Sequence, residues 1–413
     1  MYKADVVIVG AGASGLSAAY HIAKSTGGKA VIYVLEHKDR PAKKILASGN
    51  GRCNFTNDVI DKESYRGNNP CFAYNLIKKY DKKWLISFFR ELGIVHTCIN
   101  GYYYPHSLQA ATVVNSFISA LNRYNVHIIT DAHADNIYHS GEKRYIVTAN
   151  DVKYSAPYVV LASGGKSYMP LGADGSGYKL AKNMGHKVTN TFPALCGLIL
   201  KGINFKRASG VRAKGNVKLI CQNTIISESS GELQFADYGL SGIPVFQISR
   251  YAADIINSGG SCELGIDIVP DYREDELYDI ISEIMHNNPE RSFASVLNAF
   301  IPIKLSEVLI HDLSIKNVRD MCAGIKNIYL TVKDIMPFDK AQVTAGGVDV
   351  SEIENDTMQS KFCSGLYITG ELLDIDGNCG GYNLHFAFAT GACAGMHIGG
   401  RMTDGNKNKS VKG

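Results

Sequence analysis

Three glycines near the N-terminus have the spacing of a dinucleotide-binding turn. Gly10, Gly12 and Gly15 form the pattern G-x-G-x-x-G directly after the apolar run at residues 5–9, and Glu36 follows about 20 residues on. In such a turn the first glycine permits a sharp bend, the second lets backbone approach a pyrophosphate, and the third lets a helix pack closely on a strand. A carboxylate at Glu36 accepts hydrogen bonds from ribose hydroxyls and disfavours a 2′-phosphate, so NADP is not expected in this turn.

Three further segments favour FAD over NAD as the bound dinucleotide. Residues 43–57, KKILASGNGRCNFTN, are rich in small and hydrogen-bonding residues, which suits a loop laid along phosphates or a polar ring. Residues 159–165, VVLASGG, read as a buried strand that brings backbone close to a ligand. Residues 370–384 contain further glycines and open a second predicted helix. The positive end of that helix would stabilise negative charge on a reduced flavin.

Candidate catalytic residues stand where this last helix begins. His385 suits proton exchange near neutral pH, with packing between Leu384 and Phe386 as the equal alternative. Tyr382 would donate a hydrogen bond to a substrate carbonyl, or else pack on the ring. Cys379 places a sulfur near the flavin, but no second cysteine stands nearby for thiol–disulfide exchange.

Composition narrows the class of protein. The chain has 413 residues, 41 of them glycine, and a formal net charge of +4, which gives no electrostatic case for nucleic acid or an anionic membrane. Its 10 cysteines contain no C-x-x-C pair, so we expect reduced thiols, no metal site and a cytoplasmic protein. No segment has the roughly 18 apolar residues that a membrane span requires. The expected partner is a small-molecule substrate, and the oligomeric state stays open.

The elements that must position these residues form two domains. A strand at 5–9, a helix at 16–25 and a strand at 30–36 make a βαβ unit, and residues 74–93 and 108–124 have helical spacing. We predict a FAD-binding domain from residues 1–190 and 336–400. An inserted domain at 191–335, first β and then helical, interrupts it, and residues 401–413 form a polar, frayed tail.

The sequence resembles a bacterial family of NAD(P)/FAD-dependent oxidoreductases, also described as aminoacetone-oxidase-family FAD-binding enzymes. The resemblance rests on residues 43–57, GELQFADYGLSGIP at 231–244, and residues 344–350 with 358–395, and it runs to about Gly395. Reductases of dehydro-bile acids from gut bacteria are similar to this family. The chain departs from the family pattern at Asn50, at Ala236-Asp237, and at Cys379 and His385, which leaves the substrate open.

The resemblance implies an α/β fold: a three-layer Rossmann domain of the glutathione-reductase type, with an inserted β-barrel-like and helical domain. It also implies where FAD binds, and residues 132–134 would pass near the adenine. Together the motifs and the resemblance predict these cofactor-binding residues: Gly10, Gly12, Ala13, Ser14, Gly15, Glu36, His37, Lys44, Ser48, Gly51, Arg52, Cys53, Asn54, Ala134, Ser163, Gly164, Gly370, Glu371, Asp374, Gly381, Tyr382, Asn383 and Leu384.

The predicted activity is hydride transfer between flavin N5 and a small organic substrate. By resemblance, the reaction reduces an activated C=C of an enone- or steroid-like compound, with NAD(P)H as a transient electron donor because no second G-x-G-x-x-G unit is present. Three alternatives stay open: a flavin-dependent amine oxidase, an FAD-dependent RNA-modifying enzyme, and a flavin-binding protein without turnover.

Overall fold

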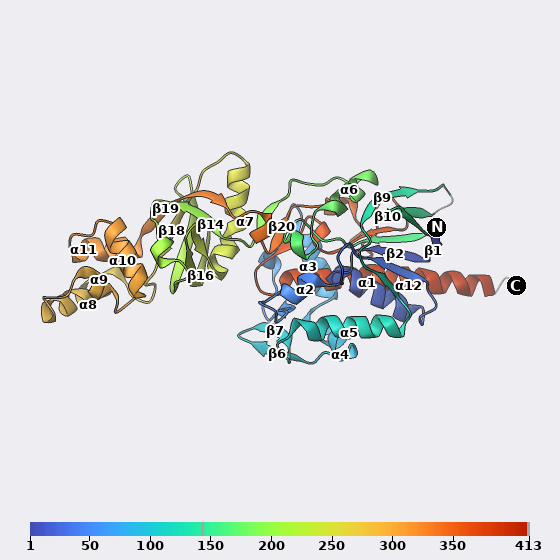
Figure 1. Cartoon of the computed structure of the whole chain (residues 1–413), viewed down its shortest axis with the longest axis horizontal. Coiled ribbons are helices and arrows are strands. Elements are labelled where there is room, and N and C mark those ends of the chain that lie inside the picture. The colour runs from blue at the N-terminus through green and yellow to red at the C-terminus, as the bar shows by residue number, and fades with distance from the viewer. Residues whose placement is uncertain (142–143, 411–413) are drawn as a thin grey trace. The chain divides into compact units, whose positions relative to one another are not determined.

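The computed structural model of the chain describes residues 1–141 and 144–410 and divides into two compact units (Figure 1). Unit 1 combines residues 1–191 with the chain from Val343 onward, and unit 2 is Phe192–Gln342. The fold class is confirmed: a Rossmann-type α/β unit carries an insertion that contains a closed β-barrel.

A five-stranded parallel sheet forms the centre of unit 1. The strand order is β21-β12-β2-β3-β8, and β2 (Val6–Val9) pairs with β12 on one side and β3 on the other. Every residue of β2 is buried, as expected for a strand covered on both faces. The other strands are β3 (Ile32–Leu35), β8 (His127–Ile129), β12 (Tyr158–Leu161) and β21 (Leu366–Ile368).

A four-stranded sheet of order β1-β11-β10-β9 lies on the opposite side of the parallel sheet from α1 and α5, which makes three layers (Figure 1). Residues 142–143, between β9 and β10, lie outside the described residues. The elements of these layers are β1 (Tyr2–Lys3), β9 (Ala134–His139), β10 (Tyr145–Ala149), β11 (Val152–Ala156), α1 (Ala13–Ser25) and α5 (Ala110–Arg123).

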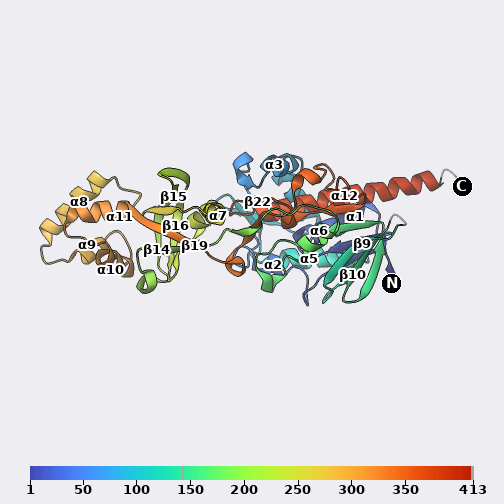
Figure 2. The same ribbon diagram turned by 90° about the horizontal axis from the view of Figure 1, so that it is seen from above.

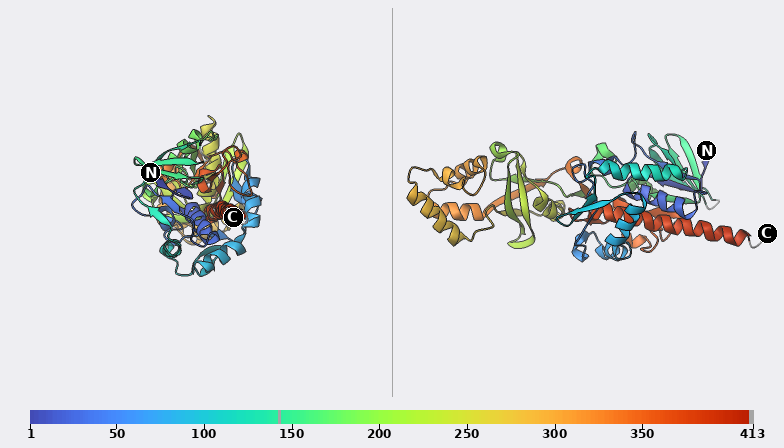
Figure 3. Two further views of the ribbon diagram at one scale, coloured as in Figure 1. Left: turned by 90° about the vertical axis from the view of Figure 1, so that its right-hand side faces the viewer. Right: turned by 90° about the horizontal axis from the view of Figure 1, so that it is seen from below.

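Helix α12 (Tyr382–Ser410) packs against α1 along a stripe of glycines (Figure 2). A Cβ at Gly391 would collide with the carbonyl of Ser14, and one at Gly395 would lie 2.6 Å from the carbonyl of Ala18. Because both partners advance along the chain together, the two helices are parallel and their N-termini point the same way. Figure 3 shows α12 continuing into the segment predicted as a frayed tail; residues 411–413 lie outside the described residues.

Shorter elements surround this core. The region 74–93 forms two helices rather than one, because the chain leaves the helix at Tyr80 and Asp81 caps the next by accepting a hydrogen bond from the amide of Trp84 (2.8 Å). These elements are α2 (Lys43–Ala47), α3 (Pro70–Lys79), α4 (Lys82–Glu91), α6 (Ser176–Asn183), β4 (Thr56–Asn57), β5 (Tyr65–Arg66), β6 (His96–Ile99), β7 (Tyr102–Pro105), β20 (Val343–Ala345) and β22 (Asp376–Gly377).

Unit 2 is a closed barrel of order β14-β17-β16-β15-β18-β19, with four helices gathered at one end (Figure 2). Alternating burial along β15 turns Val217 and Leu219 into its core. Its elements are β13 (Phe192–Ala194), β14 (Leu198–Lys201), β15 (Arg212–Cys221), β16 (Thr224–Ala236), β17 (Gly239–Ser241), α7 (Ile243–Asn257), β18 (Glu263–Asp267), α8 (Glu274–Asn287), α9 (Phe293–Leu297), α10 (Ile303–Asp312), α11 (Val318–Lys326) and β19 (Ile328–Ile335).

No helix within the described residues combines the length and the apolar run that crossing a membrane requires.

Candidate functional site

The glycine turn at residues 10–15 has the geometry of a phosphate-binding turn. Gly10 has φ +103°, and a Cβ there would lie 2.5 Å from the carbonyl oxygen of Ala162. A Cβ at Gly15 would collide with the carbonyl of Gly10, so α1 approaches the strand only without a side chain. A Cβ at Gly12 would meet nothing within 4 Å. The turn therefore leaves open space at the N-terminus of α1, where a ligand phosphate would be stabilised.

Glu36 holds this turn from the end of β3. Its Oε2 accepts the amide hydrogen of Ala11 (3.0 Å) and its Oε1 accepts that of Lys38 (2.9 Å). The residue is 8% exposed. A carboxylate has further acceptor sites beyond these two bonds, so Glu36 can still accept from a ribose hydroxyl, as predicted.

Lys44 and Glu371, both predicted to bind the cofactor, form an ion pair with each other (Nζ–Oε2 2.6 Å). The second carboxylate oxygen of Glu371 accepts the amide hydrogen of Thr344 (2.9 Å). In turn the hydroxyl oxygen of Thr344 accepts from the amides of Lys166 (2.7 Å) and Ser167 (3.0 Å). This network joins four segments of unit 1. The ion pair of Lys44 with Glu371 therefore helps to fix these segments relative to one another.

The loop at residues 48–54 contains both exposed and buried residues that were predicted to bind the cofactor. Arg52 is exposed and has no ion pair within the described part of the chain. Cys53 is fully buried at φ +59°, and burial raises the pKa of its thiol to about 12, which favours packing over redox chemistry. Ser48 donates to the carbonyl of Ile45 (2.7 Å), and Gly51 has φ +81°.

Two of the predicted cofactor residues have buried side-chain atoms that lack hydrogen-bond partners in the described chain. They are the amide of Asn54, at both its nitrogen and its oxygen, and the hydroxyl of Ser163. Buried polar groups normally have partners, and an orphaned one points to a ligand or water that completes it. Both were predicted to bind the cofactor. Together with the open space at Gly12, these unpartnered atoms fit a site that binds FAD.

The segment at 370–384 is shaped by close backbone approaches. A Cβ at Gly381 (φ +94°) would collide with the side-chain oxygen of Asn54, and one at Gly370 would lie 2.6 Å from the hydroxyl of Ser14. Asp374 is buried, and its Oδ2 accepts from the amide of Asn68 (3.4 Å). The amide of Asn383 bridges both backbone groups of Gly377 (2.8 and 2.9 Å), so this side chain shapes the loop.

The remaining predicted cofactor residues are found in the same unit. Ala13 and Ser14 begin α1, His37 follows β3, Ala134 begins β9, Gly164 follows β12 with φ +77°, and Leu384 lies in the first turn of α12.

The three candidate catalytic residues differ in what they can do. His385 is fully buried: its Nε2 donates to the carbonyl of Tyr80 (2.7 Å) and its Nδ1 accepts from the hydroxyl of Thr56 (2.8 Å). Burial lowers its pKa to about 4. Tyr382 donates its hydroxyl to the carbonyl of Val59 (2.7 Å), and burial raises its pKa to about 12. This geometry favours the packing alternative for both.

Cys379 precedes α12 and is only partly covered. Burial raises the pKa of its thiol to about 11, so it carries its proton at neutral pH. Tyr102, on β7, contacts the same loop: a Cβ at Gly380 would lie 2.8 Å from its ring. The pKa of Tyr102 is also raised, mainly by burial and to a smaller extent by the nearby Cys379. Two proton-carrying groups therefore stand beside the start of α12.

Two residues near the site escaped the sequence analysis. The hydroxyl of Tyr178, in α6, is buried and has no partner within the described residues, and Thr56 fixes the orientation of His385. Thr56 lies in the predicted loop at 43–57, but its bond to His385, like the place of Tyr178, follows only from tertiary packing.

The chain matches the family model described as "HI0933-like protein Rossmann domain" over residues 4–397. It is 39% identical over 399 residues to the 3-dehydro-bile acid delta(4,6)-reductase of Clostridium scindens, covering 94% of this chain and 97% of the relative. It is 28% identical over 412 residues to the ribosomal RNA dihydrouridine synthase of Haemophilus influenzae, covering 94% and 97%.

Among solved structures, the 3-ketosteroid delta1-dehydrogenase of Sterolibacterium denitrificans resembles the chain in fold. The TM-score is 0.50 at 12% identity, with 97% of this chain and 100% of that chain covered.

Proposed function

The chain belongs to the HI0933-like Rossmann family and is an FAD-dependent oxidoreductase; from this premise we propose that it saturates an activated C=C in a small enone- or steroid-like compound, with NAD(P)H as the electron donor. The observation that carries the proposal is the 39% identity, over nearly the full length, to a protein named as a bile acid delta(4,6)-reductase. The name of the more distant relative, a dihydrouridine synthase, also describes saturation of a C=C bond.

Bound FAD supplies a hydride at its N5 atom. Saturation of a C=C bond also needs a proton at the second carbon. Of the three candidate catalytic residues, Cys379 is the one we assign to hold this proton, because it is partly accessible and protonated at neutral pH. Its S–H bond breaks as the new C–H bond forms, and solvent then reprotonates the thiolate.

Tyr382 and His385 act as positioning residues in this proposal. Tyr382 ties the start of α12 to Val59, and His385 ties it to Tyr80 and Thr56. Both therefore fix the start of α12, directly after Cys379, against neighbouring segments of unit 1. No disulfide joins cysteines in the described residues, which supports a reducing, cytoplasmic setting.

The decisive experiment starts from the absorption spectrum of the purified protein. We expect a flavin spectrum that bleaches on anaerobic addition of NADH or NADPH and returns when a 3-keto-Δ4 steroid is added. Cys379→Ala should slow this return at least about tenfold with bleaching unchanged, a typical effect of losing a proton donor. Cys393→Ala, which removes a buried cysteine further along α12, is the matched control. A colourless protein that cannot be reconstituted with FAD would overturn the proposal.

RNA is the second candidate substrate, favoured by the ribosomal RNA relative. The net charge of +4 gives it little electrostatic support. Reoxidation of the reduced protein by a uridine-containing ribosomal RNA fragment, and not by the steroid, would select it. Hydrogen peroxide formed from a small amine without any nicotinamide donor would select amine oxidation instead. Bound FAD that no donor reduces would indicate a protein without turnover.

A further inference from the structure

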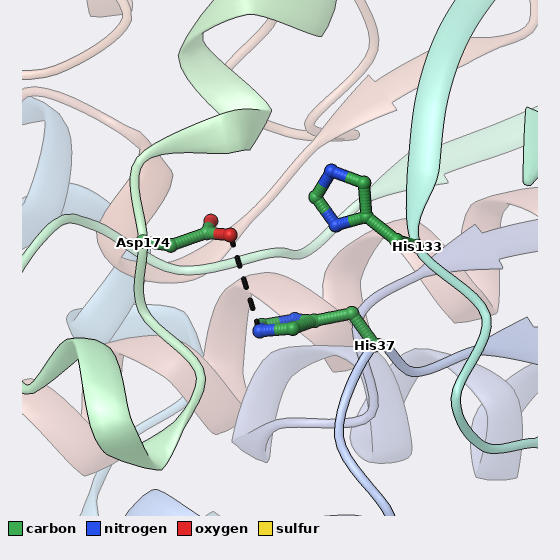
Figure 4. Close-up of side chains that lie close together, drawn as sticks. All are labelled: His37, His133 and Asp174. Carbon is green, nitrogen blue, oxygen red and sulfur yellow. Dashed lines mark ion pairs between the residues drawn. The ribbon is translucent and has the colours of Figure 1, made fainter. Parts of the chain in front are cut away.

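Three side chains that can bind metal ions meet at the end of the parallel sheet. His37 directly follows Glu36 at the end of β3, His133 precedes β9, and Asp174 precedes α6. Figure 4 shows all three side chains pointing toward one another from their separate segments. Each offers one ligand atom, and these atoms all lie within 4.8 Å of one another. Segments distant in sequence thus bring together two imidazoles and a carboxylate.

Asp174 is oriented before any ligand arrives. Its Oδ1 accepts the amide hydrogen of Ser176 (2.9 Å), and its Oδ2 lies 3.9 Å from Nε2 of His37. A carboxylate oxygen therefore faces the ring of His37.

Glu36 stands on the other side of that ring. Its Oε1 lies 3.7 Å from Nδ1 of His37. When the proton of the neutral ring is on Nδ1, beside Glu36, the lone pair of Nε2 is directed at Asp174. Two acceptors then face each other, an arrangement that a cation between them stabilises. A carboxylate behind the imidazole and a second carboxylate in front of it is the usual setting of a metal-bound histidine.

We propose that His37, His133 and Asp174 bind one divalent transition-metal ion of the Zn²⁺ type. Two histidine nitrogens and an aspartate oxygen form a ligand set that such ions accept, with water completing the coordination. With bonds of about 2.0–2.1 Å, the ligand atoms of a tetrahedral site stand about 3.4 Å apart. The 3.9 Å separation of Nε2 and Oδ2 closes to this value with a small side-chain rotation.

The ion ties three loops of unit 1 together beside Glu36. The proposal departs from the expectation drawn from the sequence, which was that the chain has no metal site because it lacks a C-x-x-C pair. That argument concerned cysteine ligands only, and histidines 37 and 133 are too far apart in sequence to form a recognisable motif. The site shares His37 with the predicted FAD contacts, and it is independent of the identity of the substrate and of the electron donor.

The test uses untagged, FAD-loaded protein that has been treated with a chelator. Equilibrium dialysis against Zn²⁺ should give one ion per chain, and Cu²⁺ in the same site should show nitrogen hyperfine structure in its electron paramagnetic resonance spectrum. His133→Asn and Asp174→Asn should each weaken Zn²⁺ binding at least about tenfold. Asparagine at position 174 keeps the acceptor for the amide of Ser176, so α6 should still form.

The matched control is His311→Asn, which removes an exposed histidine that also contacts an aspartate. It should leave the stoichiometry and affinity unchanged. Absence of Zn²⁺ uptake by the FAD-loaded protein overturns the proposal, and so does uptake that both variants retain. The flavin spectrum and turnover of the same samples report on the proposed function separately, so that a failure of either idea is recognised as its own.

Discussion

The two units of the chain differ in how their interiors are completed. In unit 1, buried polar atoms of Asn54, Ser163, Tyr178, His186 and Asn378 have no hydrogen-bond partner within the described residues. Unit 2 is described in full and contains no such atom. Most of its ion pairs lie at the surface, as between Arg212 and Glu232, and the partly buried Lys326 is paired with Asp267.

This difference indicates which unit the ligand belongs to. A buried polar group without a partner costs about 1–3 kcal/mol, and a folded protein tolerates several only where something else completes them. Unit 1 also contains the close backbone approaches at Gly10, Gly15 and Gly381. The interior of unit 2 is completed by its own residues, whereas the interior of unit 1 contains polar atoms that a bound ligand would complete.

The largest expected effect concerns the glycine stripe of α12. Gly391→Ala should destabilise unit 1 by about 3 kcal/mol or more, because the new Cβ collides with the carbonyl of Ser14. Gly400→Ala, in the same helix with nothing within 4 Å of its Cβ, should be neutral or stabilising by up to about 1 kcal/mol. Chemical denaturation checks both. Equal stability of the two variants would break the argument from close packing.

Lowering the pH should reduce the stability of unit 1, because two of its histidines are buried. Burial lowers the pKa of His21 and of His385 to about 4, while an unfolded histidine titrates near 6.5. Between these values the unfolded chain binds a proton that the folded chain does not, so stability falls as the pH drops from 6.5 to 4. Each histidine should account for about 3 kcal/mol at pH 4.

His385→Gln should remove about half of this acid loss. The amide can still donate to Tyr80 and accept from Thr56. His286→Gln, in α8 of unit 2, is measured alongside as the control. An acid profile of H385Q identical to that of the natural protein would mean that His385 is already charged when folded.

FAD should stabilise one unit only. At a concentration one hundred times its Kd, a ligand that binds the folded state adds about 2.7 kcal/mol. We expect amide hydrogen exchange to slow in β2, β3 and α1 when FAD is added to the stripped protein, and to stay the same in the barrel strands β15 and β16. Slowing of equal size in both units would remove the distinction between them.

The smallest effect separates ligand contacts from folding contacts. Asn54→Ala should weaken FAD binding about tenfold, or about 1.4 kcal/mol, and leave the FAD-free protein as stable as before, because its amide has no protein partner to lose. Asn298→Ala in unit 2 removes an acceptor for Ser306 and should do the reverse, costing about 1 kcal/mol of stability with FAD binding intact. Titration of the flavin spectrum and thermal melting report the two quantities.

The parts of the site that depend on local backbone were predictable from the sequence. The turn at Gly10, Gly12 and Gly15 is one strand, one bend and one helix, and each glycine has a local reason. The Rossmann fold and the barrel insertion followed from such patterns together with the family resemblance.

Contacts between distant segments were not predictable. His385 is bonded to Thr56 and Tyr80, more than 300 residues away, and no periodicity encodes that. The break between α3 and α4 was missed because apolar spacing continues across it, although Asp81 is a typical capping residue. The amide of Asn383, a predicted FAD contact, also closes the loop at Gly377, and the motif did not indicate this role.

The pairing of α1 with α12 has a consequence for biosynthesis. The hydroxyl of Ser17 bonds to the carbonyl of Phe388 (2.8 Å), a contact between residues 371 positions apart. A chain emerging from the ribosome at about 5–20 residues per second has its glycine turn exposed for tens of seconds before α12 exists. During that time the barrel unit, complete in sequence, can fold first. The cofactor pocket is thus the last part of the molecule to close, and a chain truncated before α12 would leave the apolar face of α1 without its cover.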